Sequence, residues 1–529
     1  MHLPLRGLCL SCAVLVASTA LWAQNPSARP VIRTDAKHDV SPNLRDIPPV
    51  ALPSNSQEIE QSEQTLEASP GPYRSARDLK ASAGVMEDPV LQSSAVTPNN
   101  MTLGLTFDGI AGNGWTVADP NVAVGATQVV QFVNDRYAVY SKTTGAKQLG
   151  PSGINTLWNG FGGSCQNRNN GDPIVQYDKA AARWVMMQHA TPPGGPFYLC
   201  VAVSTTSDGT GSYNRYAFQV SQWPDYPKLG VWPDAYYVSY DNLLNGGGVT
   251  SEACALNRSS MLNGSSATSV CFAVNSKYVH LLPADADGTI APPSGAPNYF
   301  MNLGTNSLNI WQFSVNWSNT SNSTFTGPTN ISVASFSKAC SGGTCVPQQG
   351  TGQQLDSLGD RLMYRLAYRH FNDGHESLLV THSVNSSPSG VRWYEIRSPG
   401  SGPNVYQSGT YSPNSNWRWE GSAAMDKAGD MAIGYSLSSS SMHPAIACAG
   451  RLSTDALGTL ESENIILTGS GSQQSGNNRW DDYTSLSVDP IDDCTFWYTN
   501  EYYSSNSVSS WNTRIVSFKF SSCSAANAK

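Results

Sequence analysis

The sequence has few charged residues and no run of basic ones. Lys and Arg total 31 and Asp and Glu total 39 among 529 residues, so charged side chains make up 13% of the chain, where an average soluble domain carries about 25%. The formal net charge is -8. Because affinity for DNA or RNA rests mainly on clustered Lys and Arg, we expect no nucleic-acid partner.

The short motifs that mark several enzyme classes are also missing. The chain contains no HExxH, no P-loop and no dinucleotide fingerprint, and the stretch around Ser436 lacks the final glycine of a nucleophile elbow. After the first 23 residues there is no CxxC pair that would suggest a metal-thiolate site. We therefore expect no cofactor, with Ca²⁺ as an open possibility considered below.

Long apolar runs are confined to the N-terminus. Residues 1–23 hold one early Arg6, an apolar stretch over residues 8–20 and a small residue before Gln24, which is the pattern of a secretory signal peptide. The apolar stretch is shorter than the roughly 20 residues that a membrane-spanning helix needs. We predict export to an extracellular or periplasmic location, without a membrane span.

Nine cysteines remain after the signal peptide. In an oxidising compartment they should pair. Proximity in the sequence favours four bonds and leaves Cys448 as the odd thiol. The predicted pairs are Cys340–Cys345, Cys254–Cys271, Cys165–Cys200 and Cys494–Cys523.

The remaining sequence divides at about residue 100. Residues 24–100 are rich in Pro, Ser, Glu and Gln and lack a sustained apolar period, which predicts a disordered leader. From residue 101, short apolar or aromatic runs alternate with Gly, Asn, Asp and Pro, as is typical of an all-β fold. Residues 524–529 are predicted to be a tail.

An internal repeat gives the most specific prediction of the fold. Residues 422–436 align without a gap to residues 485–499, and both read as strand, turn containing an aspartate (Asp426 or Asp489), then strand. Four further copies place turns at 125, 178, 233 and 373, and a third strand follows each hairpin. Such units cannot bury both faces alone, and radial stacking solves this.

We therefore predict a six-bladed β-propeller over residues 101–523. The one long interval between turns, from 233 to 373, suggests an insertion at 241–305. Seven blades are the alternative if that range is itself a degenerate blade. Residues 102–106 could supply the outer strand of the last blade and close the ring.

The repeated Asp-turn hairpins, the Trp480–Tyr483 segment and the stretch from Ser204 to Tyr213 resemble secreted bacterial propellers of the broad sialidase-like or Asp-box (BNR-repeat) class. The Asp-box reads roughly Ser-x-Asp-x-Gly-x-Thr-Trp, and the stretch around Asp208 has its glycine displaced. The resemblance implies the propeller fold. It does not imply sialidase activity, because one fold hosts many functions.

Equivalent positions of the repeats should form a ring around one channel opening. An acidic residue precedes each hairpin: Asp119, Asp172, Asp225, Asp360, Glu420 and Asp482. Aromatic and basic residues lie near them in the sequence, namely Trp223, Trp419, Trp480, Tyr483, Arg361 and Arg479. We predict these twelve residues as a ligand-binding mouth. The competing interpretation is that the acids accept backbone N–H bonds at blade entrances.

Three functions remain open from this pattern. Carboxylates and aromatic faces suit a carbohydrate-like or other extracellular ligand, which favours a secreted recognition module. Crowded carboxylates could instead hold Ca²⁺. The alternatives are a glycoside hydrolase or lyase with a catalytic set drawn from Asp482, Glu420, Glu501 and Tyr483, and a structural or adhesive surface protein.

Overall fold

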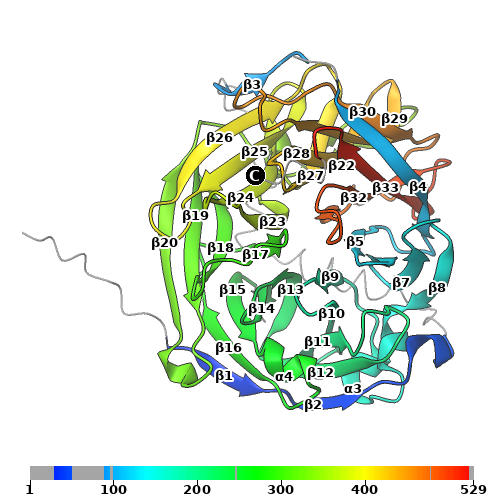
Figure 1. Ribbon diagram of the computed structural model, residues 1–529. Coiled ribbons are helices and arrows are strands. Elements are labelled where there is room, and N and C mark those ends of the chain that lie inside the picture. The colour runs from blue at the N-terminus through cyan, green and yellow to red at the C-terminus, as the bar shows by residue number, and fades with distance from the viewer. Residues whose placement is uncertain (1–28, 50–87, 96–98, 245–246, 477, 524–529) are drawn as a thin grey trace, which may run out of the picture.

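The computed structural model describes residues 29–49, 88–95, 99–244, 247–476 and 478–523. This part of the chain is all-β, with a few short helical turns. Figure 1 shows the strands grouped in sheets around a common centre. The predicted signal peptide and the C-terminal tail lie outside the described residues.

Most strands belong to seven antiparallel groups of four strands, called sheets here, that follow one another along the chain. The fourth and fifth of these are joined by the parallel pair β17–β23 into one nine-stranded sheet. The first sheet has β5 (Asn121–Val124), β6 (Gln128–Val133), β7 (Arg136–Ser141) and β8 (Lys147–Gly153). The second has β9 (Ile174–Asp178), β10 (Arg183–Ala190), β11 (Phe197–Ser204) and β12 (Tyr213–Val220). The third has β13 (Trp223–Val231), β14 (Tyr236–Leu243), β15 (Val249–Leu256) and β16 (Thr268–Ala273).

The remaining sheets continue the same order. The fourth has β17 (Leu282–Asp287), β18 (Asn298–Gly304), β19 (Ser307–Ser314) and β20 (Thr324–Ser332). The fifth has β23 (Met363–His370), β24 (Glu376–Asn385), β25 (Ser389–Arg397) and β26 (Asn404–Tyr411). The sixth has β27 (Trp417–Met425), β28 (Met431–Ser439), β29 (Met442–Arg451) and β30 (Asn464–Thr468). The seventh has β31 (Ser485–Val488), β32 (Phe496–Tyr503), β33 (Trp511–Phe520) and β4 (Met101–Ala111).

Short elements lie in the connections between strands. They are η1 (Leu44–Asp46), η2 (Ile154–Trp158), α3 (Gly163–Asn167), α4 (Arg258–Leu262), η3 (Thr320–Asn322), η4 (Ala339–Gly342), and a ribbon of β21 (Thr344–Val346) with β22 (Leu355–Asp356). None of the helices in the described ranges is long and apolar enough to cross a membrane.

The first strand of each sheet lies innermost, and these inner strands contact one another in cyclic order. β5 contacts β9, and the contacts continue through β13, β17, β23 and β27 to β31, which contacts β5 again. β17 and β23 also pair directly as parallel strands. β4 pairs antiparallel with β33, as predicted for residues 102–106, so the first and last parts of the ring share one sheet. The inner strands therefore surround the centre seen in Figure 1.

Local sequence explains the inner hairpins. The inner strands β5, β9 and β31 are four or five residues long, each combines aliphatic with polar residues, and nearly all their side chains are buried. An aspartate ends several of them because its side chain caps the turn. Asp178 Oδ1 accepts the amide N–H of Ala181 at 3.1 Å, and Asp426 Oδ1 accepts that of Ala428 at 2.8 Å. Capping of the turn by the aspartate side chain is therefore the structural role of the repeated Asp-turn motif.

The hydrophobic core is divided among the interfaces between neighbouring sheets. One cluster joins Val185 and Val203 of the second sheet to Val238 and Leu256 of the third. Equivalent clusters lie between the other neighbours. Each sheet thus buries its two faces against the sheets beside it, which is how the repeats compensate for having no core of their own.

The insertion predicted at 241–305 is wrong. This range supplies β15 and β16 to the third sheet and β17 and most of β18 to the fourth. Ile310 lies in β19, the third strand of the fourth sheet. The hairpin of the fourth sheet was missed because its strands run 282–287 and 298–304, with a ten-residue connection in place of a tight turn.

The prediction of disorder over 24–100 is wrong for two pieces of that segment. β1 (Val31–Thr34) pairs with β16, β2 (Lys37–Val40) pairs with β12, and β3 (Leu91–Gln92) pairs with β26. These strands need no apolar period because the exposed edge of an existing sheet supplies their hydrogen-bond partners. Residues 50–87 lie outside the described residues.

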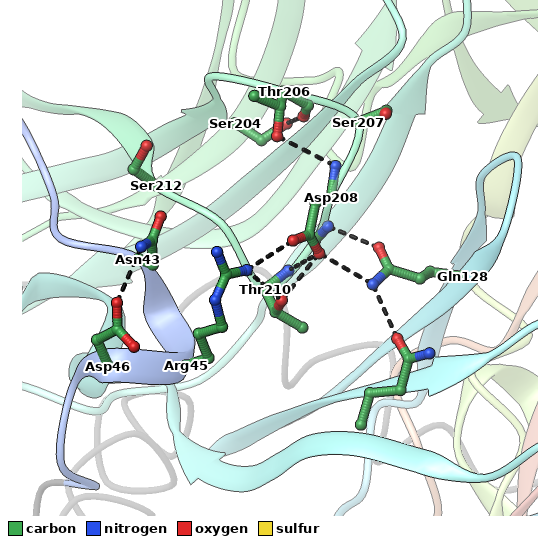
Figure 2. Close-up of polar contacts among 12 residues, drawn as sticks. Asn43, Arg45, Asp46, Gln128, Ser204, Thr206, Ser207, Asp208, Thr210 and Ser212 are labelled. Carbon is green, nitrogen blue, oxygen red and sulfur yellow. Dashed lines mark hydrogen bonds and ion pairs between the residues drawn. The ribbon is translucent and has the colours of Figure 1, made fainter.

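The Asp-box-like stretch anchors the leader to the ring. Asp208 Oδ1 accepts hydrogen bonds from Thr210 and from Gln128 of the first sheet, and Asp208 Oδ2 accepts one from Arg45 Nη1 at 2.7 Å (Figure 2). Beside this network the side chain of Leu44 is buried, with 1% exposed. The motif that carried the resemblance therefore has a structural role here, joining two sheets and the leader.

All four predicted disulfides are present. They join Cys165 to Cys200, Cys254 to Cys271, Cys340 to Cys345 and Cys494 to Cys523. Cys448 is free and buried, as predicted for the odd thiol. Four bonds agree with an oxidising, extracellular or secreted environment.

Candidate functional site

The candidate site lies at the end of the ring where the inner strands begin, called here the entrance end. A residue with a left-handed backbone occupies the start of several inner strands: Asp119 (φ 44°), Asp172 (φ 47°), Tyr226 (φ 51°), His280 (φ 57°) and Glu420 (φ 50°). This conformation is uncommon outside glycine. Asp119, Asp172 and His280 lie two residues before their strands, whereas Tyr226 and Glu420 lie at irregularities in the pairing of β13 and β27.

Three of the predicted acids converge at this end. Carboxylate oxygens of Asp119, Asp172 and Asp482 lie within 4.8 Å of one another, and all three residues are buried. Two of these acids also accept backbone bonds between neighbouring sheets. Asp482 N donates to Asp119 Oδ1 at 2.7 Å, and Tyr226 N donates to Asp172 Oδ2 at 2.9 Å. These acids therefore converge at one end, as a ligand-binding mouth requires, and also accept backbone N–H bonds, as the competing interpretation predicts.

Lys228 supplies a cation beside the three acids. Its side chain is fully buried, and its Nζ lies 3.4 Å from the ring centroid of Tyr226 and 4.1 Å from that of Tyr483. Burial lowers the pKa of Lys228 to about 8, although Asp172, Asp482 and Asp119 oppose the shift. The tyrosine rings thus hold the ammonium close to the carboxylates.

Two arginines act on the same group of acids. Arg479 forms an ion pair with Asp482, and Arg361 Nε donates to Asp360 Oδ1 at 2.9 Å while lying over the ring of Tyr226. Burial opposes ionisation of Asp482, but Arg479, Arg361 and Lys228 outweigh it and lower its pKa. Burial and the charges of Asp482 and Asp172 raise the pKa of Asp119 instead. Two neighbouring carboxyls therefore differ in proton affinity.

A second set of buried acids, Glu420, Glu501 and Asp481, interacts electrostatically with the first set. Glu420 and Glu501 are fully buried, and none of their carboxylate oxygens has a hydrogen-bond partner within the described residues. Burial raises the pKa of both, and the charge of Asp481 adds to the effect. Burial also raises the pKa of Asp481 to about 8. With a pKa of about 8, Asp481 favours its protonated, uncharged form at neutral pH.

Three of the four aromatic residues predicted for the mouth are fully buried. Trp419, Trp480 and Tyr483 are 0% exposed, and Trp419 packs edge-to-face against Trp480 with centroids 5.8 Å apart. Trp223 is half-buried beside Phe197. Because Trp419, Trp480 and Tyr483 fill the space between sheets, their ring faces are not accessible for stacking on a sugar.

The other predicted residues have mixed outcomes. Asp225 lies at an irregularity in the pairing of β13 with β14, outside the group of three converging carboxylates. Asp360 lies with Arg361 near the ring of Tyr226. Sequence reasoning did not select Lys228 or His280. The available signal for Lys228 was a single lysine next to the apolar run from Leu229 in an inner strand.

The comparisons with known proteins give only distant structural likeness. No family model matches the chain, and no curated protein matches it. Solved structures with similarity include a polysaccharide lyase of a new family, the PL25 ulvan lyase (10% identity, TM-score 0.41, 76% of this chain and 95% of that chain). Another is the N-terminal domain of Nup159 (8% identity, TM-score 0.34, 81% and 99%). A third is Trypanosoma rangeli sialidase (10% identity, TM-score 0.34, 65% and 54%).

The solved structures with similarity thus include a sialidase and a polysaccharide lyase. Likeness at this level assigns no activity to the present chain.

Proposed function

We propose that this protein is an exported seven-bladed β-propeller that recognises an extracellular, carbohydrate-like ligand. The cyclic contacts of the inner strands and the pairing of β4 with β33 support a closed ring of seven blades. The N-terminal sequence and the four disulfides support export.

One observation carries the choice of site: carboxylates from three blades converge at the entrance end, next to Lys228. Carboxylates accept hydrogen bonds from hydroxyl groups, and an ammonium donates them, so the group is suited to a polyhydroxylated ligand. Asp172 and Asp482 retain 8% and 9% exposure, the largest of the three acids. The aromatic side chains contribute by positioning Lys228 and take no part in stacking.

A Ca²⁺ ion fits the same three carboxylates. Two oxygens bound to one Ca²⁺ at 2.3–2.6 Å lie at most about 5.2 Å apart, and the oxygens of Asp119, Asp172 and Asp482 lie within 4.8 Å. Such an ion would compensate carboxylate charge and could bind ligand hydroxyls. Metal dependence is therefore part of the test.

The experiment measures retention on a glycan panel and the appearance of new reducing ends, with Ca²⁺ and with a chelator. We expect retention without cleavage, lost in Asp172→Asn. Asp373→Asn serves as the matched control, because Asp373 lies in an exposed turn with 63% of its side chain accessible. Retention that persists in Asp172→Asn would refute the site.

A hydrolase is the second candidate, favoured by the opposite pKa shifts of Asp119 and Asp482. Neighbouring carboxyls with different proton affinities are what acid and nucleophile roles require. Turnover on the same panel that disappears in Asp482→Asn would establish the enzyme and displace the recognition module.

A further inference from the structure

A separate cavity lies at the opposite end of the ring, where the inner strands end. It has a volume of about 230 Å³ and is lined by the segments after β9, β13 and β17, with Pro490 from the seventh sheet. Lys179, Ala286 and Asp287 also line a smaller axial cavity of about 30 Å³. None of the residues that line these two cavities was selected from the sequence as part of a ligand-binding mouth.

The walls of the larger cavity are mainly apolar. Val231, Trp232 and Pro233 form one side, and Ile290 and Pro292 belong to the segment after β17. Trp232 is held in place by its indole N–H, which donates to Ala296 O at 3.3 Å, and by packing against Tyr368 with centroids 4.6 Å apart. A preformed, mostly apolar cavity with few polar groups is the usual form of a small-molecule site.

The arginines near the cavity already have partners. Arg258 binds both carboxylate oxygens of Asp178, with Nε–Oδ2 2.6 Å and Nη2–Oδ1 3.0 Å. Arg365 is shared by Asp285 and Asp287. Burial raises the pKa of Asp285, although the charge of Arg365 opposes this shift.

Lys179 is the exception. Its Nζ donates one hydrogen bond, to Ala286 O, and it forms no ion pair within the part of the chain that the structure describes. An ammonium has three N–H donors, so two remain for another acceptor. Burial lowers the pKa of Lys179 to about 8, even though Asp287 favours its charged form. An anionic group in direct contact would restore the solvation that the ammonium has lost.

We propose that this cavity binds a small carboxylate with an apolar body, with the carboxylate at Lys179 and the body against Trp232 and Ile290. The apolar walls exclude strongly hydrated ligands, and Lys179 is the one cation of the lining without a carboxylate partner among the described residues. The same chemistry could come from a free small acid or from the C-terminus of a peptide that ends in an apolar residue. This site is independent of the proposed recognition at the entrance end.

Calorimetric titration with 3-phenylpropanoate and with 3-phenylpropanol tests the proposal on the full chain. The two probes share the apolar body and differ in charge. We expect the acid to bind at least about tenfold more tightly, which corresponds to about 1.4 kcal/mol. The tripeptide Gly-Gly-Phe, with a free or an amidated C-terminus, shows whether a peptide end also satisfies the site.

Variants identify the groups involved. Lys179→Met should remove the preference for the acid, whereas Lys179→Arg should retain most of it. Lys277→Met is the matched control, because Lys277 is an exposed lysine outside the cavity lining. Ile290→Asp should weaken the acid and the alcohol together.

Any one of three results would contradict the proposed binding of a carboxylate at Lys179. Equal affinity for acid and alcohol, no binding of either probe or of the peptide, or a preference that survives in Lys179→Met would each overturn the proposal. If Lys179→Met does not fold, the proposal is still tested by comparing the acid with the alcohol on the unmodified protein, and by the variants Lys179→Arg and Ile290→Asp.

Discussion

Replacing Arg365 with methionine should destabilise the protein strongly, because this side chain joins three sheets. Arg365 lies in β23 and is 1% exposed. Its guanidinium pairs with Asp285 (Nη1–Oδ2 2.7 Å) and Asp287 in β17, and its Nε donates to Leu486 O in β31 at 2.9 Å. From sequence alone, this arginine could equally have bound a substrate carboxylate.

The expected magnitude follows from what the substitution leaves behind. Methionine fills a similar length, so the loss of packing is small, but two buried carboxylates lose their cation. Removing one partner of a buried pair costs about 3–5 kcal/mol. The side chain is almost completely buried, so solvent screening does not reduce this figure.

Urea unfolding followed by tryptophan fluorescence measures the change in the free energy of unfolding. The triple variant Arg365→Met, Asp285→Asn, Asp287→Asn is the control, and it should recover at least half of the loss because no buried charge remains unpaired. A loss below about 1 kcal/mol for the single variant, the range of exposed ion pairs, would refute the reasoning.

Two further predictions concern the acid set and the leader. The pKa of Asp481 in the folded protein is about 8, above its value in the unfolded chain. Its favourable contribution to the free energy of unfolding is therefore complete below about pH 4 and is lost as pH rises through 8, by up to about 1.4 kcal/mol per pH unit. Asp481→Asn should therefore be more stable than the parent at pH 8, with a difference that shrinks toward pH 5 in thermal unfolding; an equal difference at both pH values would contradict this. In the leader, Leu44→Ala should cost about 2–5 kcal/mol because Leu44 is 1% exposed. Arg45→Ala should cost at most about 1 kcal/mol, because its pair with Asp208 is solvent-exposed; similar losses for the two would show that the leader is held by charge.

Several features were predictable because they depend on neighbours in the sequence. The hairpins around Asp426 and Asp489 could be read from the sequence because an aspartate side chain caps its own turn. The disulfides followed from proximity, as the bond between Cys340 and Cys345 illustrates. The fourth sheet was missed because the connection between β17 and β18 has no such local signature.

The site was predictable only in part. Convergence of Asp119, Asp172 and Asp482 follows from equivalent repeat positions once a ring is assumed. The burial of Trp419 and the place of Lys228 between two tyrosine rings do not, because they depend on how neighbouring sheets fill the space between them.

The amino-acid sequence by itself determined the all-β class, the periodic Asp-capped hairpins and the pairing of the cysteines, since each is set by contacts between residues close along the chain. The number of sheets, the use of leader strands at sheet edges and the partners of each buried charge were decided only in the tertiary structure. The reason is physical: a sheet edge, a gap between sheets or a carboxylate without a cation exists only after distant segments have packed together.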